Sequence, residues 1–81
     1  MEKITNDMID NCLFFLKEHK GHVSRYSFDS FVTKNIKISE SFNIMPRKLL
    51  REGLISVERE GNETWVTLTS KGINKLKNRE K

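Results

Sequence analysis

Residues of the types that carry catalysis or bind metals are few in this 81-residue chain. Its one cysteine, Cys12, has no second cysteine with which to form an internal disulfide or a thiolate metal site. His19 and His22 have a spacing that would let two imidazoles share a metal ion, but no third ligand accompanies them. A solvated pair at a helix C-terminus, where positive charge is favoured, is the stronger interpretation. No phosphate-binding loop or nucleophile motif occurs, so we expect a protein that is not an enzyme and needs no cofactor or metal.

Basic side chains gather on one face of a helix that we predict from the cap residue Ser39 towards Glu52. Phe42, Met45 and Leu49 recur at helical spacing and are expected to face the core. The opposite face holds polar, basic and apolar side chains, namely Ser41, Ile44, Arg47, Lys48 and Arg51. Arginine and lysine can contact guanine or phosphate, and serine or asparagine, including Asn43, can hydrogen-bond to bases or backbone. A solvated helix face is the alternative.

The overall charge permits nucleic-acid binding without establishing it. Lysine and arginine number 15 against 11 acidic residues, which gives a net charge of +4. A chain of this length forms one domain, here residues 1–81, with a thin core. It has neither a membrane-length apolar run nor a basic-then-apolar leader, so we expect a cytoplasmic protein without a membrane partner.

The segment from Leu54 to Thr69 predicts a β-hairpin. Two strand-like runs, 54–59 and 64–69, flank Gly61-Asn62, which suits a two-residue turn. A turn there pairs Val57 with Val66 and Ile55 with Leu68 on one face, and places Trp65 and Glu58 on the other. Near the tip, Glu58, Glu60 and Glu63 outnumber Arg59, which is unfavourable for a phosphate contact, although Arg59 and Asn62 could still make one or two.

Helices are predicted on both sides of this segment. The first begins at Asn6, with Thr5 as an alternative cap, and ends at Gly21; its buried side is Ile9, Cys12, Leu13, Leu16 and His19. A short strand, 22–25, precedes a second helix capped by Ser27, with Tyr26 and Phe31 spaced as a hydrophobic staple. Pro46 should kink the third helix or divide it into two pieces. The last helix is capped by Thr69 or Ser70, and Ile73 and Leu76 should anchor it.

Two apolar residues fall outside these buried faces. Phe14 points away from the buried side of the first helix. It is either a lone exposed residue or a contact to a partner. Trp65, on the outer face of the hairpin, either packs within its own chain or binds a partner, such as a second copy that contributes Phe14.

The order of helix, short strand, two helices, hairpin and final helix resembles that of winged-helix domains. Leu49-Leu50-Arg51-Glu52-Gly53-Leu54-Ile55 is similar to the stretch that ends the family's recognition helix and begins its wing. Leu68-Thr69-Ser70-Lys71-Gly72 is similar to the run that leaves the wing. Pro46 departs from the pattern, because the family usually has an apolar residue inside an unbroken helix there.

The resemblance implies an α+β winged-helix fold, with a three-helix core, a short strand, a two-stranded wing and a C-terminal helix. It also implies sequence-specific binding of double-stranded DNA by a small transcriptional regulator that acts as a homodimer, with no small-molecule ligand. The expected DNA contacts are Ser39, Ser41, Asn43, Arg47, Lys48, Arg51, Arg59 and Asn62, and the expected partner contacts are Phe14 and Trp65. RNA binding is a variant of this hypothesis. The competing hypothesis is a protein-interaction adaptor that does not bind DNA.

Overall fold

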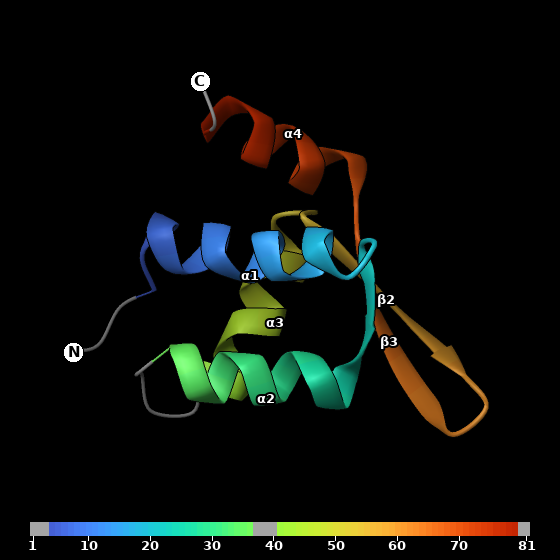
Figure 1. The fold of residues 1–81 in the computed structure, drawn as a ribbon. Coiled ribbons are helices and arrows are strands. Elements are labelled where there is room, and N and C mark those ends of the chain that lie inside the picture. Colours follow the sequence, from blue (N-terminus) through green and yellow to red (C-terminus); the bar gives the residue numbers. More distant parts are fainter. Residues whose placement is uncertain (1–3, 37–40, 80–81) are drawn as a thin grey trace.

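The computed structural model describes residues 4–36 and 41–79, which form an α+β arrangement of helices around one side of an antiparallel sheet (Figure 1). In chain order the elements are α1 (Asn6–Glu18), β1 (His22–Ser24), α2 (Arg25–Asn35), α3 (Ser41–Arg51), β2 (Ile55–Glu60), β3 (Glu63–Leu68) and α4 (Ser70–Arg79). The helices lie on one side of the molecule, and the hairpin of β2 and β3 projects from the other. Within the described ranges, no helix has the length and apolar character that crossing a membrane requires.

Side-chain oxygens and glycines define the ends of α1. Helix α1 begins at Asn6, as predicted, and Thr5, the alternative cap, is its N-cap, because its hydroxyl accepts a hydrogen bond from the amide of Met8. At the other end Gly21 has a φ of +79°, and its amide donates to the carbonyl of Leu16 at 2.6 Å. The predicted left-handed glycine at this end is confirmed.

Helix α2 begins three residues earlier than predicted. Its N-cap is Ser24, whose hydroxyl accepts from the amide of Ser27 at 3.2 Å. Ser27 therefore lies inside the helix, and the prediction that it is the cap was wrong. Tyr26 belongs to the first turn and is 82% exposed, so it forms no staple. Both serines have the side-chain chemistry of a cap, and in the structure the Ser24 hydroxyl also donates a hydrogen bond to the Ser27 hydroxyl at 3.1 Å.

Helix α3 runs through Pro46 as one α-helix, so the prediction that it divides into two pieces was wrong. A proline removes a single N–H donor, and here the buried proline ring packs against neighbouring residues, which offsets part of that loss. Met45 and Leu49 are fully buried, as predicted. Gly53, which the sequence places as the glycine that ends this helix, follows it with a φ of +74°, the left-handed conformation that such a glycine adopts. Ser39 lies outside the described residues.

The sheet has the order β1-β3-β2, and its register matches the predicted hairpin. Ile55 pairs with Leu68, Val57 with Val66, and Glu58 with Trp65. Because successive side chains alternate between faces, the register defines two sides. The helix-facing side carries Ile55, Val57, Arg59, Thr64, Val66 and Leu68. The outer side carries Ser56, Glu58, Glu60, Glu63, Trp65 and Thr67, with His22 and Ser24 from β1.

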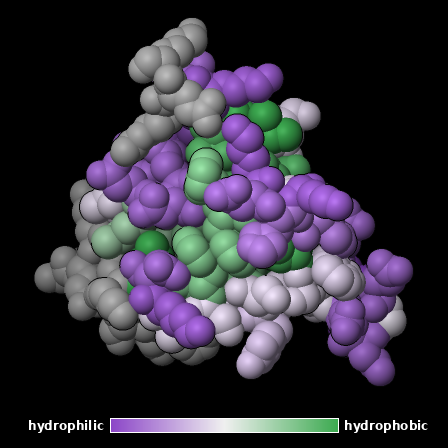
Figure 2. Space-filling view, viewed as in Figure 1, coloured by the Kyte–Doolittle hydropathy of each residue, from purple (hydrophilic) through white to green (hydrophobic). Residues whose placement is uncertain are grey.

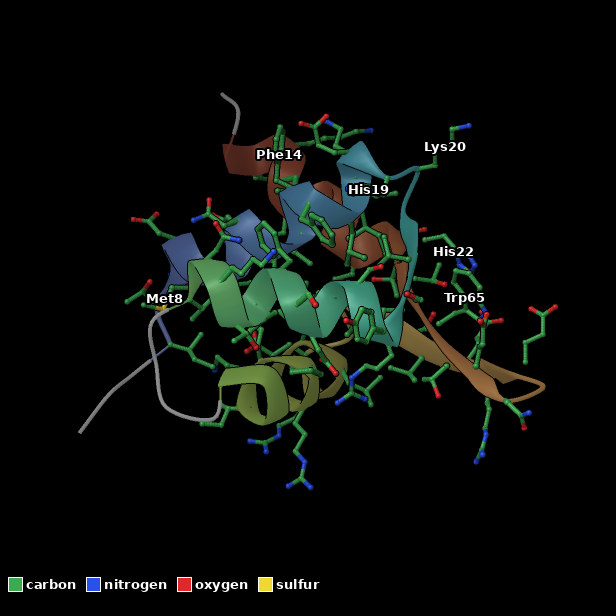
Figure 3. All side chains as sticks on the ribbon, turned by 60° about the horizontal axis from the view of Figure 1, so that its bottom comes forward. Met8, Phe14, His19, Lys20, His22 and Trp65 are labelled. Atoms are coloured by element: carbon green, nitrogen blue, oxygen red, sulfur yellow. The ribbon has the colours of Figure 1, made fainter. Side chains whose placement is uncertain are left out.

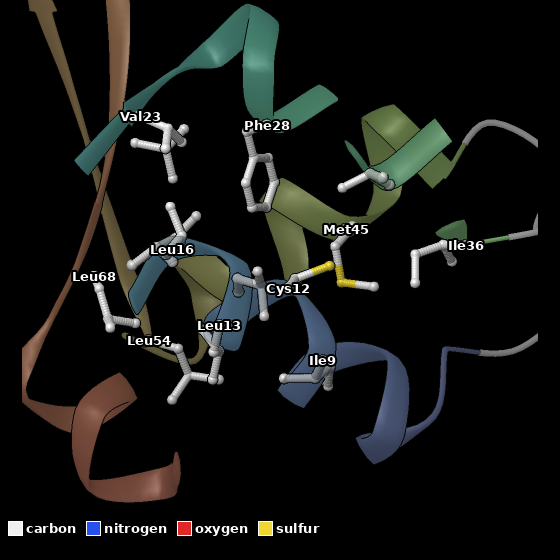
Figure 4. Close-up of a cluster of buried hydrophobic side chains, with 14 of the residues drawn as sticks. Ile9, Cys12, Leu13, Leu16, Val23, Phe28, Ile36, Met45, Leu54 and Leu68 are labelled. Carbon is white, nitrogen blue, oxygen red and sulfur yellow. The ribbon is translucent and has the colours of Figure 1, made fainter. Parts of the chain in front are cut away.

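The hydrophobic core joins all four helices to the helix-facing side of the sheet (Figure 4). Cys12, Leu13, Leu16 and Phe28 are fully buried there. Two predicted core residues are not buried. His19 is exposed because it lies beyond the end of α1, and Ile73 is 38% exposed because α4 turns Gly72 and Leu76 inward instead. Thr69 caps α4, accepting from the amide of Gly72 at 3.1 Å.

Burial raises the pKa of the Cys12 thiol to about 12. The unfolded thiol ionises at a lower pH, so the folded state loses relative stability as the pH rises from the unfolded pKa towards 12. We expect the wild-type melting temperature to fall across this alkaline range and the fall to be smaller in Cys12→Ala. Parallel thermal melts measured by circular dichroism check this. An identical alkaline fall in both proteins would contradict it.

Candidate functional site

The exposed side of α3 carries two arginines four residues apart, Arg47 and Arg51. Their helix buries Met45, Pro46 and Leu49 on its other side, which turns both guanidiniums outward. In Figure 3, long nitrogen-tipped side chains project from the free side of this helix. Ile44 and Leu50, also on the exposed side, are 43% and 50% exposed. The face can therefore offer charge-assisted donors and apolar contacts together.

Lys48 lies at the edge of this face and forms an ion pair with Glu52. Its Nζ is 3.1 Å from a carboxylate oxygen of Glu52. Glu52 in turn lines a separate groove with Lys71 and Asn74 of α4. An exposed pair at this spacing contributes only about 0.3–0.5 kcal/mol, but it neutralises the lysine locally. Among the predicted DNA contacts, Lys48 is therefore the weaker cation.

A third arginine, Arg25, meets α3 across a surface hollow. The hollow has a volume of about 270 Å³ and is lined by Arg25, Pro46, Arg47, Leu50 and Val57. Arg25 is the first residue of α2, and Asp29 one turn later holds its Nε at 3.0 and 3.2 Å from the two carboxylate oxygens. This i,i+4 pair orients the guanidinium beside Arg47 and, like the pair of Lys48 with Glu52, neutralises part of its charge locally. Three elements, α2, α3 and β2, thus contribute to one surface.

The hairpin divides its charges between its two sides. Arg59 lies on the helix-facing side, in register with Thr64 and two residues beyond Val57, which lines the hollow. Glu58, Glu60 and Glu63 all lie on the outer side. The acidic residues near the tip, which argued against a phosphate contact in the sequence, therefore point to the side opposite Arg59. We call Arg25, Arg47, Arg51 and Arg59 the arginine face.

A second hollow extends this surface towards the hairpin turn. Its volume is about 450 Å³, and its lining is Ser24, Arg25, Tyr26, Asn62, Glu63 and Thr64. Arg25 lines both hollows, so they adjoin. The exposed ring of Tyr26 and the amide of Asn62 supply polar groups at this end, and Glu63 places one carboxylate at its border. The surface therefore runs from α3, past the start of α2, to the hairpin turn.

Several predicted contact residues come together here and others do not. Arg47, Arg51, Arg59 and Asn62 belong to the surface just described. Ser41 and Asn43 lie in α3, but their side chains are outside the described part of the structure. Sequence reasoning missed Arg25 and Tyr26, because it placed the cap of α2 at Ser27. The i,i+4 spacing of Arg25 and Asp29, which form an ion pair, was the signal that could have identified the earlier start.

Trp65 lies on the outer side of the sheet, as predicted, and packs within its own chain. Its ring stacks on His22, with centroids 4.5 Å apart and planes 9° from parallel (Figure 3). His22 Nδ1 is also within hydrogen-bond distance, 3.1 Å, of Thr67 Oγ1. The sequence alternatives had Trp65 on a helix or over Glu58; its ring contact is instead with β1.

Phe14 occupies a different surface, between α1 and α2. It is 48% exposed and lines a hollow of about 430 Å³ with Asn11, Phe15, Glu18, His19, Phe31 and Asn35. Phe15 and Phe31 stack in its floor at 4.2 Å. Figure 2 shows hydrophobic side chains over the middle of the face on which these helices run. Phe14 and Trp65 lie well apart in Figure 3 and form no common patch.

The two histidines are joined by a backbone hydrogen bond, but their imidazole rings have different partners, Phe15 for His19 and Trp65 for His22. Within residues 4–36 and 41–79, no three histidine, cysteine or acidic side chains are grouped to hold a metal ion. Comparison of the chain with protein-family models, curated proteins and solved structures finds no match.

Proposed function

We propose that this chain is a cytoplasmic, winged-helix transcriptional regulator that binds double-stranded DNA sequence-specifically. The observation that carries the proposal is the arginine face, in which guanidiniums from α2, α3 and β2 lie on one side of the molecule. In this arrangement α3 is the recognition helix and the hairpin is the wing. By register Glu58 and Glu60 lie on the outer side of the hairpin, opposite Arg59, and Glu63 is the one hairpin carboxylate that borders the hollow near the turn. Arg59 can therefore approach a phosphate with few carboxylates close to the DNA.

Each part of the surface has a chemical role in this proposal. Arg47 and Arg51 enter the major groove, where guanidinium is suited to guanine O6 and N7. Arg25 sits at the start of α2, where backbone amides and the helix dipole also favour a phosphate. Arg59, which belongs to the wing, contacts the phosphate backbone beside the adjacent groove. Ile44 and Leu50 supply apolar contact to thymine methyl groups.

The proposal is tested by selecting from a pool of random duplexes and measuring binding by fluorescence anisotropy. At low salt we expect the protein to bind the unselected pool with micromolar affinity, which is typical of non-specific contacts. Selection should then enrich a preferred sequence that the protein binds at least about 10³-fold more tightly. Single-stranded DNA and duplex RNA of the selected sequence should bind more weakly. Absence of duplex binding at 50 mM salt would contradict DNA binding and favour the protein-adaptor hypothesis.

A further inference from the structure

The outer side of the sheet is a second surface, distinct from the arginine face. The buried strand residues Val23, Ile55, Val66 and Leu68 all lie on the opposite, helix-facing side. The outer side instead presents the stacked rings of Trp65 and His22, with Thr67 beside them. This stack is an apolar platform, and Trp65 is the only tryptophan in the chain.

Carboxylates surround the platform. Glu58 is directly opposite Trp65 across the strands, and Glu63 is two residues before it on the same side. Glu60 is directly opposite Glu63, which places two like charges in a cross-strand pair. Such pairs are destabilising within the sheet. A chain with a net charge of +4 thus concentrates three of its carboxylates around one aromatic stack.

Helix α4 presents a surface of complementary character. Ile73 is 38% exposed although its helix packs inward through Leu76. Lys77, four residues later, lies on the same side as Ile73 and is exposed, and it makes no ion pair within the described part of the chain. Lys75, by contrast, is directed to Asp10 at 3.5 Å. Helix α4 contains no acidic residue from Ser70 to Arg79.

We propose that the outer side of the sheet in one copy docks on α4 of a second copy. Ile73 would lie on the Trp65–His22 stack, and Lys77 would reach the carboxylates of Glu58 and Glu63. Each surface has an apolar centre with charges beside it, negative on the sheet and positive on α4. This complementarity argues that a second copy of the chain binds the outer side of the sheet. Because the surfaces differ, the contact is head-to-tail and leaves a free surface at each end of a dimer. It leaves the arginine face open and is independent of DNA binding.

The contact is tested without DNA, by sedimentation velocity from micromolar to millimolar protein. Wild type should form dimers and longer species as concentration rises, and 0.5 M salt should reduce them. Glu58→Lys with Glu63→Lys should be monomeric, as should Ser70→Glu with Lys77→Glu. Both sets of positions are exposed, and circular dichroism verifies that each variant folds.

The decisive sample is an equimolar mixture of the two charge-reversed variants. Lysines on the sheet of one variant then face glutamates on α4 of the other, so association should return to the wild-type level, with a change in Trp65 fluorescence. The triple variant Asn11→Lys, Glu18→Lys and Thr33→Lys changes the net charge by the same +4 as the sheet variant, at exposed positions of α1 and α2, and should still associate. The proposal would be overturned if wild type or the mixture stayed monomeric. It would also be overturned if the charge-reversed variants associated like wild type, or if the control variant lost association to the same extent as they do.

Discussion

Replacing Gly72 with alanine is expected to lower the free energy of unfolding by about 2–3 kcal/mol, as overpacking of a close contact does. A Cβ at this position would collide with the carbonyl oxygen of Leu54 and lie 2.7 Å from Cδ1 of Leu68. The carbonyl belongs to the backbone that also accepts from the amide of Thr69 at 3.1 Å, so it has little freedom to move. For a domain of this size the melting temperature should fall on the order of 10–20 °C.

A second glycine provides the matched control. Gly61, in the hairpin turn, has a φ of +63° and nothing within 4 Å of its Cβ position. Gly61→Asn therefore meets no neighbour, and asparagine tolerates this backbone conformation better than other side chains. We expect a melting temperature within a few degrees of wild type. Equal destabilisation by the two substitutions would mean that the contact of α4 with Leu54 is not as close as described.

Replacing Arg47 and Arg51 together with alanine is expected to abolish most of the affinity for the selected duplex. Each guanidinium that contacts a base edge contributes about 1–3 kcal/mol, so the double variant should bind at least about 30-fold more weakly. Both side chains are exposed and turned away from the core, and the substitutions should leave the melting temperature unchanged. Anisotropy titrations at one fixed salt concentration give the comparison.

The control for this loss is Lys71→Ala with Lys77→Ala, which removes two positive charges from α4. These lysines belong to a helix on the far side of α1 from α2 (Figure 1). Nanomolar protein keeps self-association from affecting the titration. We expect a change of less than about threefold from the altered net charge alone. Equal losses in the two double variants would show that DNA affinity follows total charge rather than the arginine face.

Local sequence signals predicted the hairpin and the glycine helix ends correctly. Gly61-Asn62 sets the register of β2 and β3, and alternation then places Val57 and Val66 on the helix-facing side. Helix starts were harder to predict, because Ser24 and Ser27 have the same capping chemistry. The exposure of Ile73 could not be predicted from periodicity, since the close approach of Gly72 to Leu54 is a tertiary contact that rotates α4.

The candidate site was predictable only in part. Helical spacing was sufficient to place Arg47 and Arg51 on one exposed face. The register also put Arg59 and Glu58 on opposite sides of the hairpin. The sequence did not show how the helices pack against the hairpin. That packing places Arg59 on the same side of the hairpin as α3. Arg25 joins the face only because α2 begins at that residue and packs beside β3.

The salt dependence of duplex binding tests the arginine face most directly. Arg25 is already paired with Asp29, as Lys48 is with Glu52. If the other three guanidiniums of the arginine face each neutralise a phosphate, the slope of log Kobs against log salt concentration should be about −2.7 for wild type. Arg59→Ala should make the slope less negative by about 1, whereas Glu60→Ala, on the outer side of the same hairpin, should not make it less negative. A slope near zero, or one that Arg59→Ala leaves unchanged, would contradict the placement of DNA on this surface.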